Sequence, residues 1–67
     1  MNNRLQEIRT ERKETQAELA KVMGLKTASS YCKIELGYRD ATLSEAMAVS
    51  LHWGIPIEEI FFTEKVV

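Results

Sequence analysis

Three glycines, Gly24, Gly37 and Gly54, divide this chain of 67 residues at nearly regular intervals, and each follows a segment that favours helix. Glycine readily adopts the left-handed backbone conformation in which many helices end. No segment within the first 55 positions alternates apolar and polar residues for long enough to suggest a strand. The spacing of the glycines therefore predicts an all-α fold of short helices joined by tight turns.

Cap residues predict where these helices begin. Thr15 and Thr42 are each followed three residues later by glutamate, which is the capping-box pattern, and Asn3 is followed in the same way by Gln6. Thr27 is a further N-cap, and Pro56 suits the first turn of a helix. The expected helices cover about residues 4–13, 16–23, 28–36 and 43–52, with a short fifth one starting at Pro56 or Ile57.

Apolar spacing predicts which helix faces are buried. In the helix over 43–52 the inward stripe is expected to consist of Leu43, Ala46, Met47, Ser50 and Leu51. The other helices are expected to contribute Leu5, Ile8, Leu19, Val22, Met23, Tyr31, Ile34, Ile57, Ile60 and Phe61. A chain this short has a small core and often depends on well-packed helices or a partner subunit.

The scarcity of cysteine and histidine excludes disulfide-stabilised and Cys/His zinc-binding folds for this chain. Cys32 and His52 are the single residues of their kinds, so the chain can form no internal disulfide and no four-ligand Cys/His zinc site. No apolar run reaches membrane-spanning length, and Met1–Arg4 do not resemble a secretory signal, so we expect a cytoplasmic protein. No enzymatic motif is present, and we expect no catalytic residue, metal, cofactor or small-molecule ligand.

Charge is unevenly distributed along the chain. Residues 1–40 carry eight Lys/Arg and six Asp/Glu, a balance of +2, whereas residues 41–67 carry one lysine and four glutamates, a balance of −3. One end of the molecule is therefore better suited than the other to face a polyanion.

The spacing Gln16-x3-Ala20-x3-Gly24 is typical of a helix-turn-helix. A small residue at position 20 lets the following helix approach closely, and the glycine permits a sharp turn of the chain. Any small helical bundle also needs alanines and terminal glycines, so the spacing by itself leaves both readings open.

Four ordered motifs resemble the Cro/CI-type phage repressor family. They are Arg4-Leu5-Gln6-Glu7-Ile8-Arg9, Thr15-Gln16-Ala17-Glu18-Leu19-Ala20, Lys33-Ile34-Glu35-Leu36-Gly37-Tyr38-Arg39 and Gly54-Ile55-Pro56-Ile57-Glu58-Glu59-Ile60-Phe61. The resemblance extends from Arg4 to Phe62. It implies a compact five-helix, lambda-repressor-like DNA-binding domain over residues 1–62, followed by a tail over 63–67.

The resemblance also implies roles for individual residues. The helix over 28–36 would lie in the major groove of double-stranded DNA, where Lys33 could donate to guanine. The implied base-reading residues are Ala28, Ser29, Ser30 and Lys33. The implied phosphate contacts, which position the protein without reading sequence, are Gln16, Gly37, Tyr38 and Arg39. Arg9 and Glu35 match family positions that form a structural ion pair.

The sequence departs from the family pattern at two places. The turn Gly24-Leu25-Lys26-Thr27 is one residue longer than is common, and Leu36 stands where many members have asparagine. The net charge of −1 is also low for a protein that binds DNA.

The function expected from the resemblance is that of a small transcriptional regulator of phage or prophage type, a repressor or a Cro-like competitor. The alternative is an antitoxin or adaptor that uses the same fold chiefly for protein contacts. A single helix-turn-helix reads about half a site, so we expect a homodimer. Its contact would be formed by Phe62, Val66 and Val67, unless this terminus is frayed.

Overall fold

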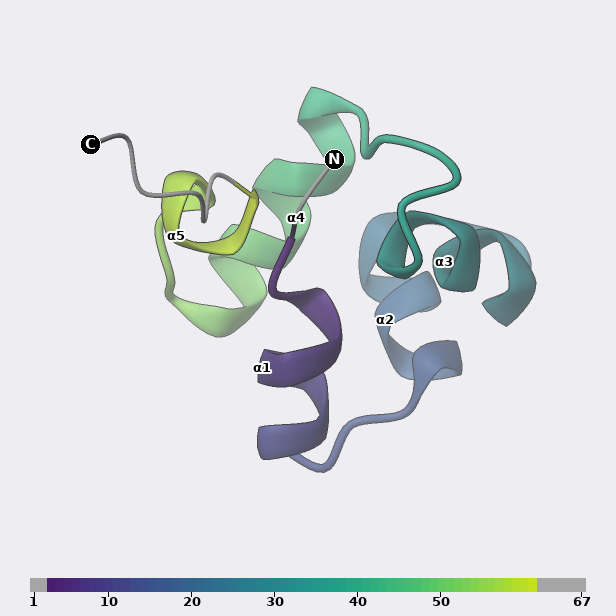
Figure 1. Cartoon of the computed structure of the whole chain (residues 1–67), viewed down its shortest axis with the longest axis horizontal. Helices are drawn as coiled ribbons and strands as arrows, with labels where there is room; N and C mark the ends of the chain where they lie inside the picture. Colours follow the sequence, from purple (N-terminus) through teal and green to yellow (C-terminus); the bar gives the residue numbers. More distant parts are fainter. Residues whose placement is uncertain (1–2, 62–67) are drawn as a thin grey trace.

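The computed structural model describes residues 3–61, which form five helices and no strand (Figure 1). The helices are α1 (Leu5–Glu11), α2 (Gln16–Met23), α3 (Ala28–Glu35), α4 (Leu43–Trp53) and α5 (Ile57–Phe61). The predicted all-α fold is confirmed for this part of the chain. None of the helices in residues 3–61 is long and apolar enough to cross a membrane.

Local side-chain caps start the middle helices. Thr15 and Thr42 each form a capping box with the glutamate three residues on, and the Thr27 hydroxyl accepts a bond from the Ser30 amide. The capping box predicted for Asn3 is wrong, because α1 begins at Leu5 and its N-cap, Arg4, makes no side-chain cap bond. The Asn3 side chain instead accepts a bond from the Leu5 amide, at 3.0 Å.

The core lies where α1, α2, α3, α4 and α5 converge. It consists of Leu5, Ile8, Leu19, Ala20, Met23, Tyr31, Ile34, Ala46, Val49, Trp53, Ile60 and Phe61. The predicted inward residues of α1 and α3 are all buried, whereas Val22 of α2 and Ile57 of α5 are only partly buried against the core.

The inward stripe predicted for α4 is largely wrong. Leu43, Met47 and Leu51 are exposed, and only Ala46 of the predicted stripe is buried. The helix turns Ala46, Val49 and Trp53 to the core instead. Trp53 is the largest of these side chains, and its burial fixes the rotation of α4 about its own axis.

Hydrogen bonds tie the start of the described chain to distant helices. The Arg4 amide donates to the Ile60 carbonyl of α5 at 2.8 Å, and the Asn3 side-chain amide donates to the Ile34 carbonyl of α3 at 3.1 Å. In Figure 1 α2 and α3 lie together on one side of the molecule, with α4 and α5 on the other. Because α2 packs on both α3 and α4, it holds α3 in place against the rest of the fold.

Candidate nucleic-acid interface

The turn between α2 and α3 has the geometry of a helix-turn-helix. Gly24 ends α2 with a left-handed φ of 77°, and the Leu25 amide then donates back to the Ala20 carbonyl at 2.8 Å. Ala20 itself is buried where α2 packs on α3, as the close approach of two helices requires. The longer turn, residues 24–27, is accommodated because Thr27 still caps α3 directly before Ala28.

Few side chains of α3 are exposed to solvent. Ser29 and Lys33 are exposed and lie four residues apart, on the same side of the helix. Ala28 and Ser30 are half-buried, and the Ser30 hydroxyl lies 3.2 Å from that of Thr27. Of the four implied base-reading residues, Ser29 and Lys33 are therefore the most accessible.

The first turn of α3 lacks an acidic residue, whereas each of the other four helices has at least one there. The N-terminal end of a helix carries a partial positive charge and unpaired amide donors, which acidic side chains normally compensate. At α3 the Thr27 hydroxyl accepts from the Ser30 amide, and no acidic side chain in the first turn adds to this compensation.

The segment after α3 places Gly37, Tyr38 and Arg39 close to the end of that helix. Gly37 has a φ of 86°, and the amides of Tyr38 and Arg39 both donate to the Lys33 carbonyl, at 2.9 Å and 3.3 Å. Tyr38 is largely exposed. The Arg39 guanidinium instead forms an ion pair with Glu45 of α4, with a distance of 3.2 Å between Nη2 and Oε2.

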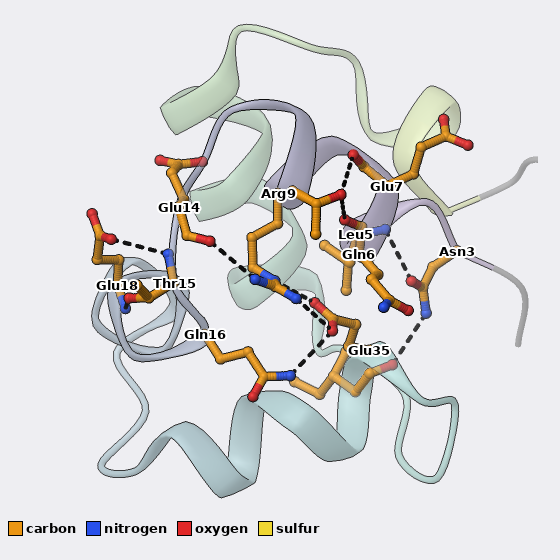
Figure 2. Close-up of polar contacts among 12 residues, drawn as sticks. Asn3, Leu5, Gln6, Glu7, Arg9, Glu14, Thr15, Gln16, Glu18 and Glu35 are labelled. Atoms are coloured by element: carbon orange, nitrogen blue, oxygen red, sulfur yellow. Dashed lines mark hydrogen bonds and ion pairs between the residues drawn. The ribbon is translucent and has the colours of Figure 1, made fainter.

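A network of buried charge connects α1, α2 and α3, as Figure 2 shows. Arg9 of α1 donates to both oxygens of Glu35, from Nε at 2.8 Å and from Nη2 at 3.2 Å. Gln16, the first residue of α2, donates to the same carboxylate at 3.1 Å. The third Arg9 contact is the Glu14 carbonyl, at 3.0 Å. Gln16 therefore braces α3 by donating to Glu35, and this hydrogen bond also fixes the position of the Gln16 side chain at the start of α2.

The surroundings of Glu35 keep it ionised. Burial raises the pKa of this carboxyl, but the hydrogen bonds from Arg9 and Gln16 outweigh burial, so the pKa lies below its ordinary value. Burial also raises the pKa of the Tyr31 hydroxyl beside it. That hydroxyl is buried without a hydrogen-bond partner of good geometry, so we attribute the lowered pKa of Glu35 to Arg9 and Gln16.

Within residues 3–40 the arginines have polar partners, whereas the lysines form no ion pair. Arg4 and Arg9 pair with Glu7 and Glu35, Arg39 pairs with Glu45, and Arg12 donates to the Trp53 carbonyl. All four lysines are exposed, and none forms an ion pair within residues 3–61. They are Lys13, Lys21, Lys26 and Lys33. Two of these, Lys26 and Lys33, belong to the α2–α3 turn and to α3. The uncompensated positive charge of this region is therefore carried by lysine.

Sequence reasoning missed two acidic residues that organise the fold. The sequence pattern assigns Glu45 only to the capping box of Thr42, yet its carboxylate also accepts from Arg39. Glu14 accepts from the Trp53 indole at 2.6 Å and lies 2.6 Å from His52, which links the α1–α2 turn to the end of α4. A capping box indicates the local bond only, and nothing in the local pattern points to either long-range partner.

The residues predicted to form a dimer contact, Phe62, Val66 and Val67, lie outside the described residues.

The search of curated proteins found no match, and neither did the search of solved structures. A profile of the helix-turn-helix family matches residues 5–60, a range that contains α1 to α4 and most of α5. The match covers most of the chain, which thus belongs to the Cro/CI-type helix-turn-helix family of DNA-binding domains, a family without enzymatic activity.

Proposed function

We propose that this protein is a sequence-specific transcriptional regulator that inserts α3 into the major groove of double-stranded DNA. Membership of the family implies DNA binding and a part in transcriptional regulation. The observation that carries the finer proposal is the exposed pair Ser29 and Lys33, next to a helix start without acidic residues. Lysine can donate to guanine O6 and N7, and serine can donate or accept at a base edge.

The base-reading role is proposed for Ala28, Ser29, Ser30 and Lys33, with Ala28 able to touch only a thymine methyl group. The phosphate-contacting role is proposed for Gln16, Gly37, Tyr38 and Arg39, which lie at the start of α2 and just after α3. The Arg9–Glu35 pair supports this arrangement, because it holds the α3 end against α1 and α2 while its charges cancel.

The regulator is further proposed to be a repressor or Cro-like competitor of phage or prophage type that acts in the cytoplasm. It would bind as a homodimer, since paired half-sites are read by two copies about 34–36 Å apart. Phe62, Val66 and Val67 remain the proposed tail contact. An antitoxin or adaptor is the second candidate, and the exposed apolar residues Leu43, Met47 and Leu51 of α4 favour it, because such residues suit a protein partner.

Two binding measurements test the proposal. Fluorescence anisotropy of a labelled random duplex should show binding that weakens steeply with added salt, because lysine–phosphate contacts release counterions. Selection from a random duplex pool should then enrich one sequence family. Salt-insensitive or absent binding to every duplex would reject the DNA-binding proposal and favour the adaptor. Binding without enrichment would reject sequence-specific recognition.

A further inference from the structure

Leu36, the residue directly after α3, is a large apolar side chain that the fold leaves uncovered. It is 57% exposed. Its backbone has a φ of −81° and a ψ of −8°, and its amide donates to the Cys32 carbonyl at 2.9 Å. These are helical dihedral angles and a helical hydrogen bond, so Leu36 continues the path of α3 and its direction follows from helix geometry.

Leu36 shares the outer face of this helix with Ser29 and Lys33. The three residues stand at positions i, i+4 and i+7, which lie on one side of a helix. At about 100° per residue, Leu36 points within about 20° of the direction of Ser29. The buried residues Tyr31 and Ile34 lie on the opposite side. A partner that meets Ser29 and Lys33 therefore also meets Leu36.

The charges around Leu36 suit a polyanion. Lys33 is exposed and forms no ion pair within residues 3–61, and the same holds for Lys26 in the turn before α3. The single acidic residue of α3 is Glu35, whose side chain is 2% exposed and paired with Arg9. No exposed carboxylate of α3 would thus repel a phosphate backbone that brings bases to this face.

We propose that Leu36 is a further specificity-determining residue, which recognises a thymine by packing against its C5-methyl group in the major groove. A leucine side chain has no hydrogen-bonding group, and thymine is the base that displays a methyl group in that groove. The inference rests on the proposed function. It adds an apolar contact to the polar contacts proposed for Ser29 and Lys33.

Helix geometry also indicates where this thymine should lie. Along the helix axis Leu36 is about 10 Å from Ser29 and about 4.5 Å from Lys33. Successive base pairs are about 3.4 Å apart. With α3 lying along the groove, the thymine should be one or two base pairs beyond the guanine contacted by Lys33, on the side away from the base contacted by Ser29.

Deoxyuridine tests the inference, because uracil differs from thymine only in lacking the methyl group. The probe is the duplex that the wild type selects from a random pool, with one thymine at a time replaced by uracil. At one position the replacement should weaken wild-type binding roughly fourfold in anisotropy titrations, as expected for the loss of one buried methyl group. Leu36→Asn should bind the thymine and uracil duplexes equally, whereas Leu36→Met, which keeps an apolar side chain, should still prefer thymine.

Leu51→Asn is the matched control. It makes the same chemical change at a leucine of α4 that is 81% exposed and remote in sequence from α3, and it should keep the wild-type preference for thymine. Circular dichroism should show that all variants are folded. Because each variant is compared on two duplexes that differ by one methyl group, a general loss of affinity does not alter the measured ratio.

Two results would overturn the inference while the proposed function stands. The first is a selected duplex in which no thymine can be replaced by uracil with a loss of wild-type affinity. The second is a preference for thymine that persists at every position in Leu36→Asn, which would assign the methyl contact to another residue, such as Ala28. A wild type that binds no duplex, or binds without enriching a sequence, would reject the proposed function and this inference with it.

Discussion

Arg9 and Glu35, 26 positions apart in the chain, meet through two hydrogen bonds at the junction of α1 with the end of α3. The side chains are only 13% and 2% exposed. Gln16, the first residue of α2, donates a further hydrogen bond to the Glu35 carboxylate. The helix proposed to read DNA is thus fixed to its neighbours by a buried charge pair as well as by the apolar contacts of Tyr31 and Ile34.

Removing one member of this pair should destabilise the protein strongly. Arg9→Met leaves the Glu35 carboxylate buried without its cation, so the free energy of unfolding should fall by about 3–5 kcal/mol. Arg4→Met is the matched control, because the Arg4–Glu7 pair lies at the surface and should contribute less than about 1 kcal/mol. Urea unfolding of the three proteins measures both effects. An Arg9→Met variant as stable as Arg4→Met would show that the buried pair does not support the fold.

Acid should weaken the link between Glu14 and Trp53. Burial raises the pKa of Glu14, but hydrogen bonds from His52 and Trp53 outweigh it, and the pKa lies below the ordinary value. A carboxyl with a lowered folded pKa contributes stability above its unfolded pKa, about 4.3, and this contribution is lost as pH falls through the folded pKa. Glu14→Gln should therefore be less stable than wild type at pH 7 by about 1–3 kcal/mol, and this difference should shrink on acidification.

Trp53 is the single tryptophan of the chain, so its fluorescence follows unfolding at both pH values once the folded signal of each variant is recorded separately. Urea titrations at pH 7 and at about pH 3.5 give the two differences. Glu11→Gln, an exposed position near the same end of α1, is the control and should match wild type throughout. A difference between wild type and Glu14→Gln that stays constant with pH would show that the charge of Glu14 does not stabilise the fold.

Lys13 offers a position where a substitution should stabilise the protein. It has a φ of 58° and is the single non-glycine residue with a positive φ in residues 3–61. Side chains disfavour this conformation, whereas glycine adopts it freely. Lys13→Gly should therefore raise the free energy of unfolding by about 1 kcal/mol, although it makes the unfolded chain more flexible. Lys21→Gly makes the same chemical change inside α2 and should lower stability by about 1 kcal/mol. Thermal unfolding distinguishes the two, and equal losses would contradict the strain at Lys13.

The boundaries of α2 could be predicted because they depend on local chemistry, whereas α1, expected over about 4–13, spans only Leu5–Glu11. The segment 16–23 was predicted with its observed bounds, since Thr15, Glu18 and Gly24 determine both ends within a few residues. The buried face of α4 could not be predicted in the same way. The helix carries two apolar rows with helical spacing, one through Ala46, Val49 and Trp53 and one through Leu43, Met47 and Leu51. Only packing against α2 and α5 determines which row is buried.

The candidate site shows the same division between local and long-range information. Ser29 and Lys33 share a face of α3 because of helix periodicity, which the sequence contains. The partners of Arg39 and Gln16 depend on how the segment after α3 meets α4, and on how α2 meets α3. Sequence spacing alone could not show that Arg39 is already paired with Glu45.

Lys33 and Arg39 should contribute differently to DNA binding. Lys33→Ala should reduce the preference for the selected sequence over random duplex by about 1–3 kcal/mol, because a base contact is lost. Arg39→Ala should weaken binding to all duplexes and lower the salt slope by about one, as expected for a phosphate contact. Anisotropy titrations on both duplexes at several salt concentrations separate the effects. Equal losses on both duplexes for both variants would contradict the assigned roles.

Glu45 should limit the contribution of Arg39 to DNA binding. Its carboxylate pairs with the Arg39 guanidinium and would compete with a phosphate for the same donors. Glu45→Gln removes the charge but can still complete the capping box with Thr42, so α4 should remain intact. This variant should therefore bind all duplexes a few-fold more tightly than wild type.

Two comparisons separate release of Arg39 from a change in net charge. Glu58→Gln removes the same charge at an exposed position of α5, and it should strengthen binding less than Glu45→Gln does. In a double-mutant cycle, Glu45→Gln should lose most of its effect once Arg39 is replaced by alanine, because the two residues then no longer interact. If Glu45→Gln strengthens binding equally with and without Arg39, the carboxylate acts on DNA through general repulsion, and the pair does not restrain the arginine.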